Sequence, residues 1–217
     1  MSASDTVQSR RDVAVERSIH KARARAEERT SLLIDAALDL VAERNSLEFT
    51  VQEVVDRTKL SLHAFYQLFE SKDSLVEAVL EQSLERGVLI LRDRVERETQ
   101  PIDRLRAFVV GYFELATQSR QPVFGSGQAF TEFSVHLNVA APAKSWSAYR
   151  PLRILAYDLL RAAIDDGSIR SDLDTDFLAG FLLLSVRSVT ELAIAGIGAA
   201  GPTGEQLWQL IADGISE

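Results

Sequence analysis

Apolar residues along most of this chain recur every three or four positions, which is the period of a helix buried on one face. The first clear example begins near Glu27, where Leu33, Ala37 and Leu40 share one face. No segment between Glu27 and Leu91 alternates apolar and polar residues with the period of two that a half-buried strand requires. The pattern therefore predicts an all-α protein.

Helix-start signals divide the next part of the chain into short helices. Thr50 is followed three residues later by Glu53, the spacing of a capping box in which each side chain bonds the other residue's backbone amide. Ser61 is placed to cap a second short helix, in which we expect Leu62 and Phe65 to lie in the core. Two short helices that follow a longer one across a three-residue turn predict a tri-helical helix-turn-helix unit.

The remaining two-thirds of the chain predicts longer helices separated by proline and glycine. We expect Pro151 to kink or break the third of these helices. The predicted organisation is an arm at 1–26, a helix-turn-helix domain at 27–75 and a larger helical domain at 76–217. The helices expected after residue 100 are 102–119, 126–137, 145–166, 174–196 and 203–215.

The net charge of −8 argues against binding to nucleic acid unless basic residues gather on one face. Basic residues, including Arg10, Arg11 and Arg17, are frequent in the first 26 positions. We interpret this segment as a mobile, mildly basic arm whose distal part can join the first helix. Either the arm contacts DNA or it is a solvated tail without function, and the sequence leaves both open.

The stretch from Phe177 to Ala200 is apolar enough to suggest a membrane span, but Arg187 and Glu191 lie near its middle. Charges at that depth are costly in a bilayer, whereas residues four apart on a helix can pair. We therefore expect a buried or interfacial helix and no membrane contact. The first thirty residues also lack the apolar run of a secretory signal, so we expect a cytoplasmic protein.

Catalytic and cofactor motifs are absent from the sequence or lack their structural context. The chain has no cysteine and three scattered histidines, so we expect no metal site. Gly196 to Gly201 spell a dinucleotide fingerprint, but they follow a predicted helix and precede Pro202, so the strand-turn-helix context is missing. We therefore expect neither an enzyme nor a bound cofactor.

Five short runs resemble, in order and spacing, the N-terminal part of the tetracycline-repressor (TetR) family. The resemblance implies a homodimer that places two helix-turn-helix units in successive major grooves of a pseudo-palindromic operator. It also implies that a small molecule bound in the second domain changes the spacing of the two units and releases DNA, more often from a repressor than from an activator. The runs are LIDAALDLVAER at 33–44, TVQEVV at 50–55, LS at 60–61, FYQLF at 65–69 and SKDSL at 71–75.

By the same resemblance, Thr50, Tyr66 and Lys72 contact phosphates, and the residues between Ser61 and Gln67 read bases. Lys59 stands where the family commonly has glycine, so it must adopt an unusual backbone conformation or change the turn. His63 and Gln67 are the polar side chains left for base edges, and Ala64 can pack on a thymine methyl group. The predicted DNA-binding residues are Thr50, Lys59, Ser61, His63, Ala64, Tyr66, Gln67 and Lys72.

Aromatic residues concentrate between positions 108 and 157, where the family surrounds its effector. An aromatic-rich helical interior suits a largely apolar or amphipathic ligand, although most of these side chains could simply form the core. The helices at 174–196 and 203–215 correspond to those that pair between subunits, and we expect Leu183 or Leu184 to face the partner. The predicted effector-binding residues are Phe108, Tyr112, Phe113, Phe130, Phe133, His136, Trp146, Tyr149 and Tyr157.

Two other functions remain open at this point. The chain departs from the family pattern at Lys59 and at Leu62-His63-Ala64, and its net charge is acidic. These features also fit a helical small-molecule- or protein-binding module whose helix-turn-helix unit has lost DNA binding. An enzyme that uses the aromatic cavity is the third possibility, although no catalytic constellation supports it. Binding to DNA separates the first two.

Overall fold

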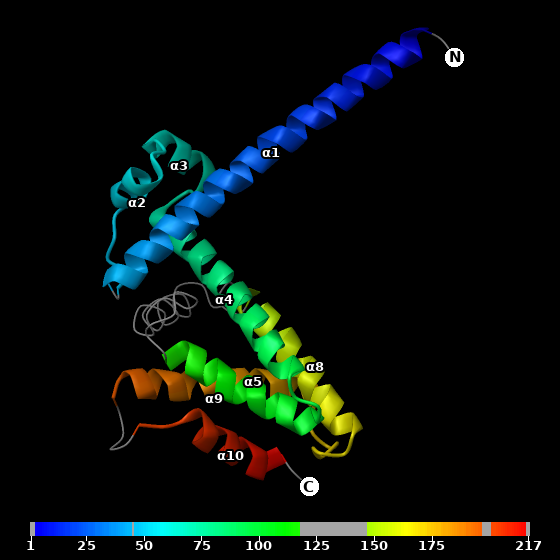
Figure 1. The fold of residues 1–217 in the computed structure, drawn as a ribbon, viewed down its shortest axis with the longest axis vertical. Helices are drawn as coiled ribbons and strands as arrows, with labels where there is room; N and C mark the ends of the chain where they lie inside the picture. The colour runs from blue at the N-terminus through cyan, green and yellow to red at the C-terminus, as the bar shows by residue number, and fades with distance from the viewer. Residues whose placement is uncertain (1–2, 45, 118–146, 197–200, 216–217) are drawn as a thin grey trace.

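The computed structural model describes residues 3–44, 46–117, 147–196 and 201–215, and every regular element in these ranges is a helix (Figure 1). The all-α prediction is confirmed. The helices are α1 (Ala3–Arg44), α2 (Val51–Thr58), α3 (Leu62–Leu68), α4 (Lys72–Glu96), α5 (Pro101–Thr117), α8 (Arg150–Asp165), α9 (Thr175–Ile194) and α10 (Gly204–Ile215).

The first helix is longer than the sequence analysis predicts. We expected an arm up to residue 26, but α1 is continuous from Ala3 to Arg44. No glycine or proline occurs in this span, so nothing interrupts the backbone hydrogen bonds. From residue 16, where side chains are described, the first buried residue is Leu33, and the N-terminal part of α1 projects from the body of the molecule (Figure 1). The helix therefore combines an exposed rod with a packed C-terminal portion.

Helices α2 and α3 pack beside the C-terminal portion of α1, together with the start of α4. Residues 32–75 are called the head below. Leu33, Val54 and Phe65 are completely buried at its centre. Leu62 was predicted to join them, but 41% of its surface is exposed, so this prediction is wrong. It is the first residue of α3, and because Cα–Cβ bonds tilt toward the helix N-terminus, its side chain extends past the packed turn.

Helix α4 links the head to the larger helical domain, which we call the sensor domain. Its first turns bury Leu75 in the head, and its later turns bury Leu91 against α5 and α8. Helix α5 is central to the sensor domain, since it packs against α4, α8, α9 and α10. Pro151 lies in the first turn of α8, directly after a turn at Tyr149, so the predicted break at this proline is confirmed.

Helix α9 has one face in the core and one face on the surface. Leu182 and Leu183 are buried, whereas Phe177 and Leu184 are exposed. Of the two positions expected to face a partner, Leu183 is thus excluded and Leu184 stays a prediction, because successive residues are turned by about 100° and Leu184 points outward. Of the described helices, α9 is long and apolar enough by composition to cross a membrane, and about a third of that stretch is buried.

Candidate DNA-reading site and sensor domain

The turn between α2 and α3 is set by two caps and one unusual backbone conformation. The Thr50 hydroxyl accepts from the Glu53 amide at 3.2 Å, and the Glu53 carboxylate accepts from the Thr50 amide at 2.7 Å. Ser61 accepts from the Ala64 amide at 3.1 Å and so caps α3. Lys59 has φ 58° and ψ 18°, the left-handed conformation, which costs a non-glycine residue on the order of 1 kcal/mol. The predicted helix starts are confirmed, and Lys59 tolerates the unusual backbone rather than altering the turn.

Helix α3 presents a polar surface away from its buried side. Phe65 anchors the helix in the core, with its ring edge-on to Tyr66 at 5.2 Å between centroids. Tyr66 itself is 58% exposed, so it is not a core aromatic. His63 and Gln67 are exposed one turn apart, with 3.1 Å between His63 Nε2 and Gln67 Nε2. The two predicted base readers therefore contact each other, and Ala64 between them is half-buried.

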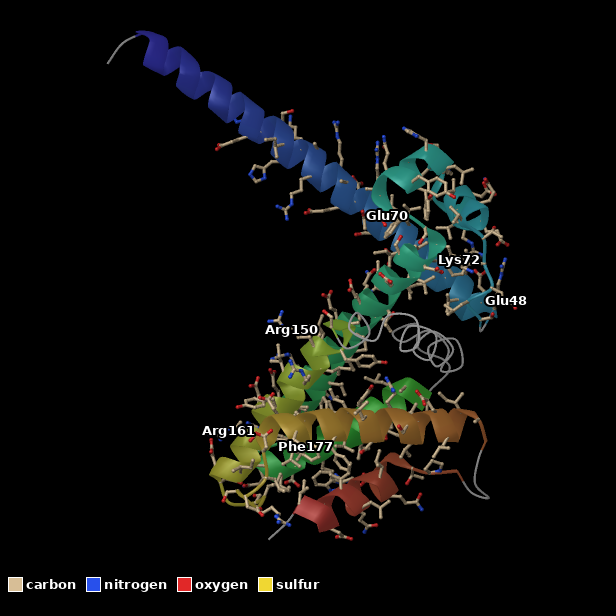
Figure 2. The ribbon with its side chains drawn as sticks, turned by 180° about the vertical axis from the view of Figure 1, so that it is seen from behind. Glu48, Glu70, Lys72, Arg150, Arg161 and Phe177 are labelled. Carbon is tan, nitrogen blue, oxygen red and sulfur yellow. The ribbon has the colours of Figure 1, made fainter. Side chains whose placement is uncertain are left out.

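Lys72 makes contacts that the sequence did not predict. Its ammonium group donates to the Leu47 carbonyl at 2.8 Å and lies 4.6 Å from the centre of the Phe49 ring. Phe49 is buried, so the lysine fastens the segment before α2 to the start of α4 (Figure 2). A lysine ammonium has three donors, and the bond to Leu47 leaves two for another acceptor. In the sequence, Phe49 directly precedes the helix cap Thr50, and this aromatic residue was the signal that could have revealed the contact with Lys72.

Ion pairs on α1 and α2 use two of the four basic residues of the head. Arg44 contacts Glu53 at 2.5 Å and Arg57 contacts Glu43 at 2.5 Å. The Arg44 hydrogen bond, helped by the bonds from Thr50, lowers the pKa of Glu53 to about 2. The head contains eight acidic residues against four basic ones. Among its four cations, Lys59 is the one without a protein partner in the described residues, since Lys72 also has one.

The predicted effector residues divide into a described group and a group whose structure is not described. Phe108, Tyr112 and Phe113 are buried on α5. Tyr149 is buried at the start of α8, and Tyr157 is half-buried within it. The other four predicted residues, Phe130, Phe133, His136 and Trp146, lie outside the described residues.

The Tyr112 hydroxyl and the Arg187–Glu191 pair place polar atoms within this aromatic interior. The pKa of the Tyr112 hydroxyl is raised well above its usual value, first by burial and then by the nearby Tyr149 hydroxyl. The guanidinium of Arg187 lies 6.0 Å from the centre of the Tyr149 ring and 3.4 Å from the Glu191 carboxylate. The predicted pairing of Arg187 with Glu191 is thus confirmed. The paired atoms, Arg187 Nε and Glu191 Oε1, are buried and make no hydrogen bond, so this interior holds an ion pair whose hydrogen-bonding capacity is unused.

An apolar groove runs between the exposed faces of α9 and α10. Its volume is about 650 Å³. Phe177 and Phe181 stack along it with 6.3 Å between ring centroids, and Leu210 on the opposite wall is 75% exposed (Figure 2). Contiguous exposed apolar surface of this kind marks an interaction site on a soluble protein. Its small residues, Ser185 and Ser188, allow another helix to approach closely.

A capped helix-turn-helix joined through a long helix to a separate all-helical domain defines a class of DNA-binding regulatory proteins. Residues 33–79 match the family model for bacterial regulatory proteins of the tetR family. Over these residues the chain is similar to the TetR family.

Relatives align with nearly the whole chain. The HTH-type transcriptional repressor KstR2 of Mycobacterium tuberculosis is 24% identical over 192 residues, which cover 85% of this chain and 92% of the relative. The solved structure of the ketosteroid transcriptional regulator KstR2 of Mycobacterium tuberculosis has a TM-score of 0.55 at 22% identity, covering 87% of this chain and 95% of that one. The transcriptional regulator FadR of Bacillus subtilis, in complex with stearoyl-CoA, has a TM-score of 0.67 at 13% identity. The match covers 85% of this chain and 98% of that one. The structural likeness shows a shared fold.

Proposed function

We propose that this chain is a ligand-responsive transcriptional repressor that binds a pseudo-palindromic operator as a homodimer and is released by a largely apolar small molecule. The observation that carries the proposal is the exposed polar face of α3, held by the Ser61 cap and the buried Phe65. Such a helix, with its base-facing side chains free of the core, is what insertion into a major groove requires. The proposed activity includes no catalytic step, and the proposed location is the cytoplasm.

Within this proposal, Gln67 and His63 read base edges. A glutamine amide carries two N–H donors and one carbonyl acceptor. If one N–H donates to His63 Nε2, the other N–H and the carbonyl remain for the bidentate contact that glutamine makes with adenine. His63 would then hold the Gln67 amide in a fixed orientation. Lys59, Ser61 and Ala64 flank this pair.

Thr50, Tyr66 and Lys72 are the proposed phosphate contacts. Thr50 and Tyr66 are exposed, and Lys72 is half-buried. The contact of Lys72 with the Leu47 carbonyl supports a dual role, in which one donor fixes the protein and two reach a phosphate oxygen. Phosphate contacts fix position and carry little sequence information.

The sensor domain is the proposed effector site, and the α9–α10 groove is the proposed dimer interface. Buried Phe108, Tyr112 and Tyr149 supply an apolar environment, and Arg187 with Glu191 offers polar atoms that can orient a ligand. One related protein is a ketosteroid transcriptional regulator, and another was solved in complex with stearoyl-CoA. We therefore expect the effector to come from steroid-like or long acyl compounds.

Selection of duplexes from a random pool by the purified protein, followed by a titration of the selected duplex, tests this function. We expect nanomolar binding to a sequence with two-fold symmetry, and weaker binding when a steroid-like or acyl-CoA compound is added. The linkage is reciprocal, so DNA must also weaken ligand binding. Failure to enrich any sequence would contradict the proposal.

One alternative has an observation in its favour. A helical binding module whose head no longer reads DNA would fit the acidic charge of residues 32–75. That module would bind steroid-like or acyl compounds with the same affinity whether or not DNA is present. Calorimetry with and without a random-sequence duplex therefore separates the two functions.

A further inference from the structure

The head is poorly supplied with positive charge for a DNA-binding unit. It contains four basic and eight acidic residues, and ion pairs engage Arg44 and Arg57. Phosphate neutralisation by lysine and arginine supplies the sequence-independent part of DNA affinity. Lys59, and Lys72 in part, cannot offset this excess of acidic residues. If the chain binds DNA, other cations must contribute.

A row of four basic residues, which we call the basic stripe, lies on the exposed rod of α1. Arg17, Lys21, Arg25 and Arg29 are each four positions apart, so consecutive members are neighbours on the helix surface. All four side chains are exposed, and none forms an ion pair or hydrogen bond with a residue that the structure describes. Arg23, outside the stripe, does pair with Glu27 at 2.8 Å.

Folding does not explain the stripe. Like charges four apart destabilise a helix by roughly 0.2–0.5 kcal/mol for each pair, and the stripe contains three such pairs. The local charge also contrasts with the rest of the protein. Residues 1–31 contain seven basic and five acidic residues, whereas the other 186 contain seventeen and twenty-seven. An exposed row of cations that pairs with no described residue, in an acidic protein, indicates an anionic partner.

The position of the rod identifies that partner as DNA. The rod extends past α3 at the end of the molecule opposite the sensor domain, so it lies on the same end as the DNA-reading surface (Figures 1 and 2). At about 1.5 Å per residue, the segment from residue 16 to residue 31 is roughly 24 Å long. DNA that carries one charge per about 1.7 Å of its axis offers many phosphates over that length.

We propose that the basic stripe binds the phosphate backbone of the DNA that flanks each half-site, and that it supplies most of the salt-dependent affinity of the protein. This inference rests on the proposed function, because it requires a head that meets DNA. It assigns sequence reading to α3 and electrostatic attachment to α1. Each arm of α1 extends the DNA contact beyond the segment that α3 can reach.

The test is the slope of log affinity against log salt concentration for a random-sequence 40-bp duplex. The stripe variant carries Arg17→Gln, Lys21→Gln, Arg25→Gln and Arg29→Gln, which remove charge and keep good helix formers. The matched control carries Arg92→Gln, Arg97→Gln, Arg150→Gln and Arg161→Gln, four exposed cations of the sensor domain. Circular dichroism of both variants checks that the helices are retained.

Neutralising a phosphate contributes about 0.9 to the slope, so we expect the stripe variant to lose about 3–4 per protomer and the control to lose little. We also expect the wild type to bind its selected operator more tightly when about 10 bp of random DNA is added at each side, and the stripe variant to show no such gain. Equal slopes for the stripe and control variants would overturn the inference while leaving the proposed function intact. A wild type that binds neither the random nor the selected duplex would instead contradict the proposed function.

Discussion

The head and the α9–α10 face are both built from packed helices, yet they use their surfaces in opposite ways. The head buries the apolar residues at its centre, such as Leu33, Val54 and Phe65, and its outer surface holds caps, ion pairs and the His63–Gln67 contact. The α9–α10 face leaves Phe177, Phe181 and Leu210 exposed around a groove. The first region is complete as a single chain and presents polar groups to a polar partner. The second has an apolar surface that a second copy of the chain can cover.

This contrast predicts that the head can be weakened separately from the sensor domain. Phe65→Ala removes a fully buried ring, and such a change costs about 3–5 kcal/mol. Both tryptophans lie after residue 145, so their fluorescence reports on the sensor domain while circular dichroism reports on all helices. We expect urea unfolding followed by circular dichroism to gain an early transition, with the fluorescence midpoint nearly unchanged. An equal fall in both midpoints would show that α4 makes the two regions unfold together.

The second prediction concerns the apolar face. Phe177→Asp places a carboxylate in the proposed interface, and in a two-fold dimer the change occurs twice. We expect the dimer dissociation constant to rise at least about thirtyfold, the effect of losing roughly 2 kcal/mol at a central contact. Sedimentation velocity measures it, with Arg161→Asp on the exposed surface of α8 as the control. If both variants remain dimeric at equal concentration, the partner does not cover this groove.

The polar face of α3 gives the third prediction. Gln67→Ala should remove about 1–3 kcal/mol of discrimination at one symmetric pair of operator positions, because a bidentate base contact is lost. Tyr66→Phe and Lys72→Met, by contrast, should weaken operator and random DNA by similar factors. Competition binding on singly substituted operators at fixed salt separates the two patterns. Unchanged specificity in both Gln67→Ala and His63→Ala would show that other residues read the bases.

A smaller effect is expected at the turn. Lys59 has a positive φ that glycine adopts without strain, so Lys59→Gly should stabilise the head by about 1 kcal/mol. The same change removes the one head cation that has no partner among the described residues, so DNA affinity should fall while stability rises. Urea midpoints and DNA titrations of this variant measure the two effects. Lys59→Asn, which keeps a residue tolerant of the left-handed region and also lacks the charge, is the control for lost charge. A head destabilised by glycine would show that the lysine conformation carries no strain.

The smallest expected effect is a dependence of head stability on pH. The Arg44 and Thr50 hydrogen bonds hold the pKa of Glu53 at about 2, below the usual value for glutamate. A lowered pKa in the folded state contributes stability above the unfolded pKa, and this contribution is lost as the pH falls from about 4.5 toward 2. Glu53→Gln keeps a residue that can complete the capping box but has no charge. The stability difference between wild type and this variant should be present at pH 7 and should shrink in this acidic range.

The local elements of the head were predictable because their signals are local. Thr50 with Glu53 and Ser61 fix where α2 and α3 begin, since a cap acts within three residues of its own position. The left-handed conformation of Lys59 was one of two outcomes that the resemblance left open, and the structure decided between them. The contact of Lys72 with Leu47 did not, because it joins residues 25 positions apart that only the packing of α4 beside the head brings together.

In the sensor domain the sequence determined which residues are apolar, and the tertiary structure decided which of them face inward. Leu183 and Leu184 are the same residue type and adjacent in the chain, yet Leu183 lies in the core and Leu184 on the surface. The apolar pattern of α9 covers almost the whole helix, so the pattern does not show which side of the helix is buried. Its contacts with α5 and α8 select that side. The basic stripe shows the reverse case: its i, i+4 spacing is written in the sequence, but a continuous helix was needed to place Arg17 through Arg29 on one rod beside the DNA-reading end. Local capping is short-ranged and can be read from the chain, whereas the choice of a buried face depends on which other helices come to lie against it.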